Sequence, residues 1–476
     1  MGMIINILEK IKEKTKENRN VTNFEWILVF IAILLPLYSF MYMDTNSIIR
    51  GGIDVIKSIF LGRFTEYYDY AKESKLAGLM VHTVDYDIIY NLTLGIWEFP
   101  VALAELITGK TFQDSMFVLI YSKSLLIIFL LLSAWMIKKI AIELKIDEAN
   151  AKWAVFMFLT SGFIFAYLCI AGQYDIMGIF FTLVGVYYYI KNDMKKFGLF
   201  FIIAVQYKFF PLFVFLPLLL VRVKKIWKIL LYIVPPIISV FLFDLPFINS
   251  SAHAEKNAVN ADMLDRVFRN KISIFSTEVP ISFLFVGAVC IFCYLKEITD
   301  AEEDRYYSIY IPFLSLSVLF LSFPFFPYWI LYLTPWIPLL YFMRKELREK
   351  FFMIEMGMSI GIIIAQYSHY NWVFELYNTK KMILDALCKY DNFTNPITLQ
   401  DTVSFLYIDE FEYLFYGLYI LCLVTMLLLY RPKKNMEYKG KEFNSRYVLW
   451  IRFGTQYIIG ALPFLLYLLS IVREYL

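Results

Sequence analysis

The chain has 476 residues, of which 60% are hydrophobic, 19% aromatic and only 18% charged. This composition excludes a soluble globular protein, and the formal net charge of +3 gives no indication of a nucleic-acid partner. Apolar runs long enough to cross a bilayer recur from Trp26 to Leu469. We therefore predict an all-α polytopic membrane protein with about 11 full spans plus a short helical hairpin.

The N-terminal segment, residues 1–22, is basic and amphipathic and directly precedes the first predicted span, Trp26 to Met43. The positive-inside rule places this segment in the cytoplasm. The span has no small-residue cleavage site, so we expect it to be retained. A long external loop, residues 44–115, should follow, with an interfacial helix near its end at residues 97–107.

The next three predicted spans bring a polar element to the outer face. Residues 116–137 return to a basic cytoplasmic segment, and residues 153–171 then lead outward to Gln173-Tyr174-Asp175. The following span, residues 176–190, ends at a basic turn. A carboxylate within such apolar sequence is costly unless it faces water or a cation, so this element is a candidate functional site.

The apolar run at residues 197–221 has cations on both sides. A single crossing would place its C-terminal basic cluster outside, whereas a hairpin of two short helices keeps that cluster in the cytoplasm. Pro211 is a plausible break at the tip of the hairpin. We therefore predict a hairpin, with Lys208 below the outer surface, where its charge needs a partner.

The second half of the chain continues with spans and two more external loops. The first loop, residues 248–278, contains a predicted surface helix with Arg266, Arg269 and Lys271, and the second covers residues 368–410. The predicted spans are residues 229–247, 279–295, 306–323, 328–343, 351–367, 411–430 and 447–470.

Cofactor and metal signals are weak. The three histidines are scattered at His82, His253 and His369, a spacing that does not predict a metal site. The sequence has no Gly-rich phosphate-binding loop of the nucleotide-binding kind. We expect neither a metal nor a cofactor.

The order of these features resembles the GT-C class of integral membrane glycosyltransferases, which includes the GPI-anchor mannosyltransferases. The resemblance covers residues 24–247, and a late aromatic element, Phe326 to Pro335, is also similar to that class. The remaining residues that carry it are Asp54 and Asp85-Tyr86 in the first external loop, Gly172-Gln173-Tyr174-Asp175, and Lys208-Phe209-Phe210-Pro211.

The resemblance implies a division of the chain and an activity. Residues 1–22 would be a cytoplasmic segment, residues 23–247 a GT-C-like catalytic membrane module, and residues 248–476 a C-terminal membrane module. The implied reaction moves a hexose, with mannose favoured, from a polyprenyl-phosphate donor to an extracytoplasmic glycan or glycolipid acceptor. Membrane lipid would be the third partner.

An external-loop carboxylate is implied as the base of an inverting transfer. The candidates are Asp85, Asp87 and Asp54. In the glucose-transferring branch of the class, the Asp-Tyr pair precedes two prolines, but here Asp87-Ile88 stands in their place, so Asp85 and Asp87 compete for the role. A solvated loop carboxylate is the alternative interpretation of all three.

Cations are needed near the departing phosphate, where negative charge develops. Lys208, Arg269 and Lys123 are the candidates, in that order. An N-cap role is the alternative for Asp175, and an outward-reaching side chain is the alternative for Lys208. The full set of predicted substrate-binding residues is Gln173, Tyr174, Asp175, Lys208, Arg269, Lys123, Tyr328 and Trp329.

Two other functions compete with transfer. A lipid-linked oligosaccharide transporter or flippase would be expected to show two related halves with equivalent broken helices. An envelope polysaccharide polymerase or ligase would be expected to show an Arg-rich late loop, but residues 368–410 contain no Arg. The abundance of Ile, Lys, Phe and Tyr indicates an AT-rich genome, so we expect a bacterial plasma membrane with the active site outside.

Overall fold

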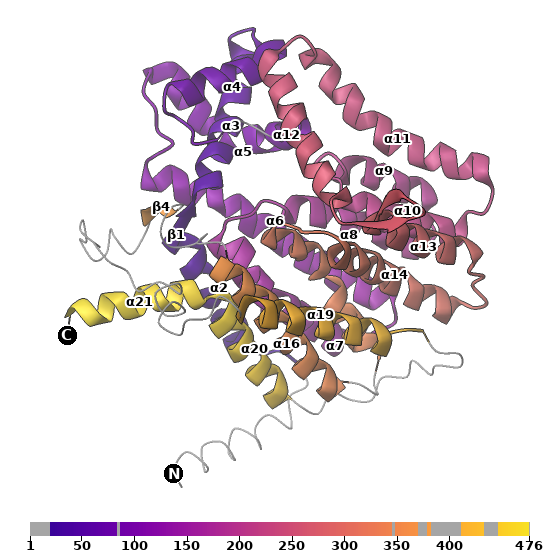
Figure 1. Ribbon diagram of the computed structural model, residues 1–476. Helices are drawn as coiled ribbons and strands as arrows, with labels where there is room; N and C mark the ends of the chain where they lie inside the picture. Colours follow the sequence, from indigo (N-terminus) through magenta and orange to yellow (C-terminus); the bar gives the residue numbers. More distant parts are fainter. Residues whose placement is uncertain are drawn as a thin grey trace.

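The computed structural model describes residues 20–82, 86–344, 348–369, 378–381, 411–432 and 446–475. These residues form an almost entirely helical protein, as predicted, with only two two-stranded sheets among them. Figure 1 shows α6 (Met116–Glu143), α8 (Ile176–Ile190) and α14 (Ala301–Ser322) crossing the body of the molecule with their axes roughly aligned.

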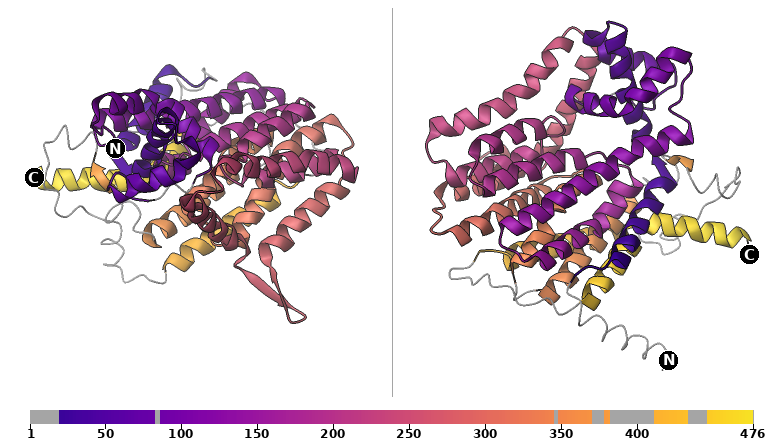
Figure 2. Two further views of the ribbon diagram at one scale, coloured as in Figure 1. Left: turned by 90° about the horizontal axis from the view of Figure 1, so that it is seen from above. Right: turned by 180° about the vertical axis from the view of Figure 1, so that it is seen from behind.

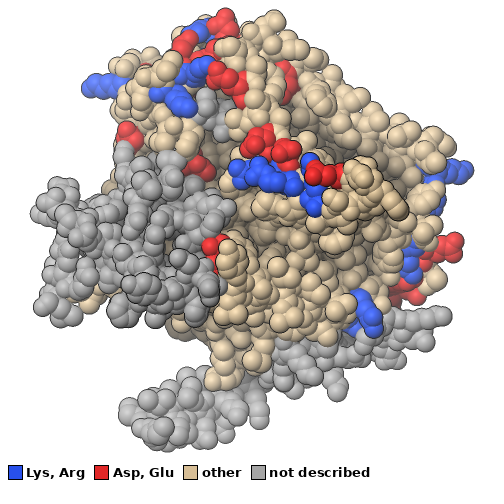
Figure 3. Space-filling view, viewed as in Figure 1, with Lys and Arg blue, Asp and Glu red and all other residues tan. Residues whose placement is uncertain are grey.

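Three helical segments in the described part of the chain are long and apolar enough to cross a bilayer: Met116–Glu143, Ile226–Phe247 and Glu412–Leu429. A fourth would be the pair α7 (Glu148–Leu159) and η2 (Ile164–Ile170), which is bent by 59°. Figure 3 shows charged side chains gathered over the upper helices and in a band near the middle, above a broad uncharged area. These features are compatible with a membrane protein, and the larger number of spans stays a prediction.

The bend between α7 and η2 lies where a glycine allows close approach. The backbone N–H of Gly162 donates to Gln456 Oε1 over 2.8 Å, and a Cβ added at Gly162 would lie 2.5 Å from the same oxygen. A larger residue would displace the side chain of Gln456, which belongs to α20 (Arg446–Gly460). The helix is therefore interrupted at a tight inter-helix contact.

The segment predicted as a long loop, residues 44–115, is instead mostly helical. It contains α3 (Met43–Phe60), η1 (Phe64–Glu66), α4 (Tyr67–Leu76) and α5 (Ile88–Thr108). The apolar side chains of α3 recur at helical spacing and are buried against α5. The fit is close, since a Cβ added at Gly95 of α5 would lie 2.5 Å from Val55 Cγ1.

A later helix, α12 (Ser251–Phe268), completes this group, which we call the cap: α3, η1, α4, α5 and α12. Asp69 of α4 accepts hydrogen bonds from Ser251 Oγ at 3.2 Å and from the backbone N–H of Ala252 at 3.1 Å. It therefore binds the N-terminus of α12, where backbone N–H groups have no partner within the helix. The cap has its own apolar core, separate from that of the body.

The predicted break at Lys208 and Pro211 is present. Six residues separate α9 (Met194–Ala204) from α10 (Pro211–Arg222), and Lys208 is one of them. Pro211 occupies the first turn of α10, where its missing N–H removes no helical hydrogen bond.

The remaining helices and strands complete the described part of the chain. Two predicted spans are interrupted: residues 328–343 form η4 (Pro327–Leu333) and α15 (Trp336–Met343), and residues 447–470 form α20 and α21 (Leu462–Tyr475). Prolines at positions 335 and 463 lie at the two interruptions. The other elements are α2 (Asn23–Ser39), α11 (Ile226–Asp244), η3 (Leu245–Phe247), α13 (Ile281–Leu295), α16 (Arg348–His369), α19 (Phe411–Leu429), and the antiparallel pairs β1 (Phe40–Tyr42) with β4 (Asn378–Lys381) and β2 (Lys271–Ile274) with β3 (Thr277–Pro280).

Candidate functional site

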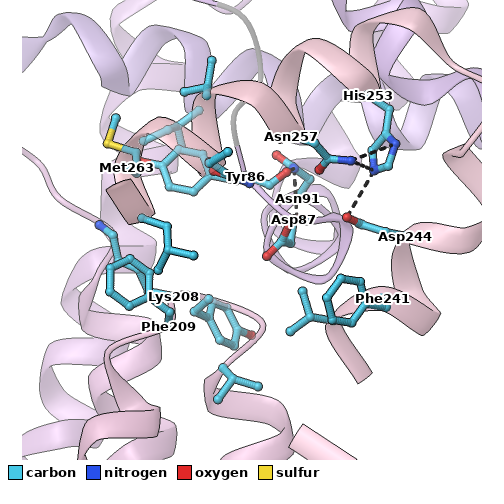
Figure 4. A pocket seen from close by; sticks show the side chains of 18 of the residues that line it. Tyr86, Asp87, Asn91, Lys208, Phe209, Phe241, Asp244, His253, Asn257 and Met263 are labelled. Atoms are coloured by element: carbon cyan, nitrogen blue, oxygen red, sulfur yellow. Dashed lines mark hydrogen bonds and ion pairs between the residues drawn. The ribbon is translucent and has the colours of Figure 1, made fainter. Parts of the chain in front are cut away.

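A cavity of about 940 Å³ lies between the cap and the body. Its wall is contributed by the first turns of α3 and α5, the end of α11, one face of α12, the connection between α9 and α10, and the aromatic turn Phe326–Trp329. In Figure 4, Asp87 and Asp244 lie on one side of this space and Lys208 on the other. The cavity thus brings charges of both signs together from distant parts of the chain.

Asp44, in the first turn of α3, lines the cavity. Its Oδ1 lies 3.9 Å from His82 Nε2. Burial raises the pKa of Asp44, while His82, the Gln173 side chain and Lys208 oppose that rise in decreasing order. A carboxyl group with a raised pKa is a better proton acceptor than a solvated one.

A second group of charges lies where α12 meets the ends of α5 and α11. The buried ammonium of Lys256 lies 2.5 Å from Asp87 Oδ1 and 2.8 Å from Asp244 Oδ2. His253 Nε2 lies 3.1 Å from the same Asp244 oxygen. We call these four residues the Lys256 cluster. Burial raises the pKa of Asp87, and the Lys256 ammonium opposes that rise.

Lys208 contributes a cation to the cavity wall. Its Nζ lies 2.7 Å from Asp175 Oδ1 and 4.8 Å from the centre of the Tyr328 ring. The Trp329 ring centre is 5.6 Å away, so two aromatic faces also stabilise the cation. An ammonium has three N–H donors, so Lys208 can hold Asp175 and donate to a substrate at the same time.

Four of the predicted site residues line the cavity: Asp87, Lys208, Tyr328 and Trp329. Two others lie immediately behind its wall, since Gln173 contacts Asp44 and Asp175 binds Lys208.

Four predicted site residues lie away from the cavity. Tyr174 points into the core and donates to the Ser122 carbonyl at 3.3 Å. Asp54 is fully buried in the cap, 2.6 Å from Arg50 Nη2. The buried ammonium of Lys123 donates to the carbonyls of Leu37 and Phe40. Arg269 is half exposed at the end of α12. Asp85 lies outside the described residues.

The sequence interpretation did not assign a role to Asp44, Asp244, His253 or Lys256. One signal was available for Asp244, which is the only acidic residue between Ile226 and Phe247. A charge at the end of such an apolar run is expected to face water or a partner. The described residues contain no group of three or more His, Cys, Asp or Glu side chains suited to a metal ion.

Neither a protein-family model, nor a curated protein, nor a solved structure matches this chain. The chemistry of the cavity and the motif resemblance are therefore the grounds for a functional proposal.

Proposed function

We propose that the protein is a multi-pass membrane glycosyltransferase with a cytoplasmic N-terminus. It would transfer a hexose, with mannose favoured by the motif resemblance, from a polyprenyl-phosphate donor to an extracytoplasmic glycan or glycolipid. The observation that supports this most is that the Asp44 carboxyl and the Lys208 ammonium line the same cavity. Such a transfer needs one carboxylate for the acceptor and one cation for the departing phosphate.

Three carboxylates line the cavity, those of Asp44, Asp87 and Asp244, and Asp44 is the best candidate for the base because Lys256 binds the other two. The Oδ1 atom of Asp87 already lies 2.5 Å from the Lys256 ammonium, so an acceptor hydroxyl would have to compete with that ion pair. The His82 ring lies 3.9 Å from Asp44, beyond hydrogen-bonding distance. In the proposed step the acceptor hydroxyl oxygen attacks the anomeric carbon as its proton passes to Asp44. The bond from that carbon to the phosphate oxygen breaks, and its electron pair leaves with the phosphate.

Lys208 would donate to the phosphate as its negative charge grows. Phe241 and Leu245, at the end of α11, supply an apolar part of the same wall. The adjoining surface of α11 is strongly exposed, with Phe241 at 68% and Leu242 at 57%. A donor with a charged head and a prenyl chain fits this combination of one cation and an apolar border.

The direct test is sugar transfer by purified protein in lipid nanodiscs. Polyprenyl-phosphate mannose and glucose, each radiolabelled, would be offered with acceptors extracted from membranes. We expect label to reach an acceptor with the native protein and with Asp262→Asn, an exposed α12 control. Asp44→Asn should lower the rate by about 10²–10⁴-fold.

Two outcomes would contradict the proposal in different ways. If Asp44→Asn keeps the native rate and Asp87→Asn loses it while staying folded, the base is Asp87 and our assignment of Asp44 is wrong. If no donor is consumed, while sealed vesicles carrying the protein move a lipid-linked sugar across the membrane without forming a glycosidic bond, the protein is a transporter.

A further inference from the structure

The hairpin of β2 and β3 has one apolar and one polar face. In its register Ile272 pairs with Val279, and Ile274 pairs with Thr277. Directly paired residues of antiparallel strands lie on the same face, and alternate residues lie on opposite faces. Ile272, Ile274 and Val279 therefore share one side, and the other side carries Lys271, Ser273 and Glu278.

This hairpin stands away from the rest of the molecule (Figure 2, left). All four residues of β2 are exposed, and Phe275 at the tip is 99% exposed. A two-stranded hairpin without a packed face is only marginally stable in water. An additional surface is therefore needed to cover its apolar side.

The turn between β2 and β3 has an aromatic residue, Phe275, in a backbone conformation that is unfavourable for a bulky side chain. Phe275 has φ of 46° and Ser276 has φ of 66°. Both lie in the left-handed region, where a bulky side chain is uncommon and glycine or asparagine is usual in such turns. Strain of this kind is kept where the side chain has a use.

The neighbouring residues indicate what covers the apolar face. Helix α13 begins at Ile281 directly after β3, and its first turns expose Phe283 at 65% and Phe285 at 47%. At the base of the hairpin, Lys271 Nζ lies 3.3 Å from Glu278, and Arg269 is half exposed. Aromatic residues beside cations are typical of segments at a bilayer interface, where cations bind anionic headgroups.

We propose that the hairpin docks on the lipid bilayer. Its apolar face and Phe275 insert at the level of the headgroups and first acyl carbons, while Arg269 and Lys271 bind anionic headgroups. Within the described residues, no further strand pairs with the outer edges of β2 and β3, so the hairpin stays at the interface and does not enter the hydrocarbon.

Docking of the hairpin would also fix the position of the cavity relative to the membrane surface. Asn270, at the base of the hairpin, donates from Nδ2 to the Ser322 carbonyl at 3.2 Å. Ser322 ends α14 just before the aromatic turn Phe326–Trp329 that lines the cavity. The hairpin would thus hold the cavity mouth beside the lipid headgroups, where a lipid-linked substrate carries its phosphate.

Spin labels on the two faces of β2 and at the tip of the hairpin test the proposal. Single cysteines would replace Ser273, Ile274 and Phe275 in a background whose five native cysteines are alanine. The labelled proteins would be placed in nanodiscs of phosphatidylcholine with and without phosphatidylglycerol. We expect labels at positions 274 and 275 to be more accessible to oxygen than to a water-soluble nickel chelate, and the label at 273 to show the reverse.

The lipid dependence supplies a second readout. The double variant Arg269→Gln and Lys271→Gln should abolish the difference between anionic and neutral nanodiscs at position 275. A photo-cross-linking residue at position 275 in the protein with its native cysteines should form adducts with lipid.

Three results would overturn the proposal: equal access of the nickel chelate to all three labels, dipolar broadening that shows two copies in contact, or cross-links to protein only. Because no donor or acceptor is used, these results are independent of the transferase assay.

Discussion

Lys208 Nζ lies 2.7 Å from Asp175 Oδ1, and this ion pair joins the turn before α8 to the connection between α9 and α10. Both side chains are largely buried, with exposed fractions of 14% and 5%. A buried pair of this kind is strongly destabilised when only one partner is removed, because the other charge is left without compensation.

Replacement of Lys208 therefore has two separable consequences. We expect Lys208→Met to lower the transfer rate by about 10²–10³-fold, the usual cost of losing one electrostatic contact to a developing charge. It should also lower the free energy of unfolding by about 3–5 kcal/mol, since Asp175 is left unpaired. The measurements are kcat and thermal unfolding in nanodiscs.

The double variant Lys208→Met with Asp175→Asn is the control. It removes both charges, so most of the lost stability should return while the rate stays low. A double variant with the native rate would show that Lys208 does not act on the phosphate.

On acidification, the activity should be lost at a higher pH than it would be if the base were a solvated aspartate. The proposed base acts only when ionised, and burial raises the pKa of Asp44 above the ordinary value of about 3.9. We expect kcat/KM to decline on the acid side with an apparent pKa above that value. A profile that stays flat down to about pH 4 would contradict the assignment of Asp44 as the base.

The raised pKa of Asp44 also predicts that its ionised carboxylate, although needed for activity, lowers the stability of the folded protein. When the pKa of a group is higher in the folded state than in the unfolded state, its contribution to stability is complete below the unfolded pKa. That contribution is lost as the pH rises through the folded pKa. Asp44→Asn should therefore raise the thermal unfolding temperature near neutral pH and give little or no gain in acid. A variant less stable than the native protein near neutral pH would contradict this prediction.

Lys256 should be more important for stability than a surface lysine of the cap. Lys256→Met would leave Asp87 and Asp244 without the ammonium between them, so we expect a loss of about 3–5 kcal/mol. The control is Lys72→Met, which breaks an exposed pair with Glu255 and should cost less than about 1 kcal/mol. Equal losses, measured by thermal unfolding, would show that the Lys256 cluster is not a structural centre.

The sequence predicted the local features of this site better than its assembly. Pro211 indicated the break near Lys208, and the position of Lys208 within an apolar run indicated that its charge needs a partner, which is Asp175. Asp87 and Lys256 are 169 residues apart, and no local pattern indicates that α12 folds back onto the first turn of α5. Contacts of this kind depend on the packing of whole helices.

The cap shows why α3, α4 and the first half of α5 were missed, although helices were predicted at residues 97–107 and within residues 248–278. Residues 44–115 were predicted as an external loop with Asp54 as a candidate base, yet Asp54 and Glu105 both bind Arg50 inside the cap, at 2.6 Å and 2.9 Å. Lys57 lies 3.1 Å from the same Glu105. Buried ion pairs allow charged residues on the inner faces of α3 and α5, so the apolar periodicity of these helices is interrupted.

The cap core also determines when the cavity can form during synthesis. Phe247 and Ala252 belong to this core, together with residues of α3, α4 and α5 that leave the ribosome much earlier. Until α11 and α12 have been made, the early helices expose an unfilled apolar surface, and the cavity lacks Asp244 and the α12 wall. A nascent chain that stops before Ser251 would carry every polar motif of the first half and still have no enclosed site.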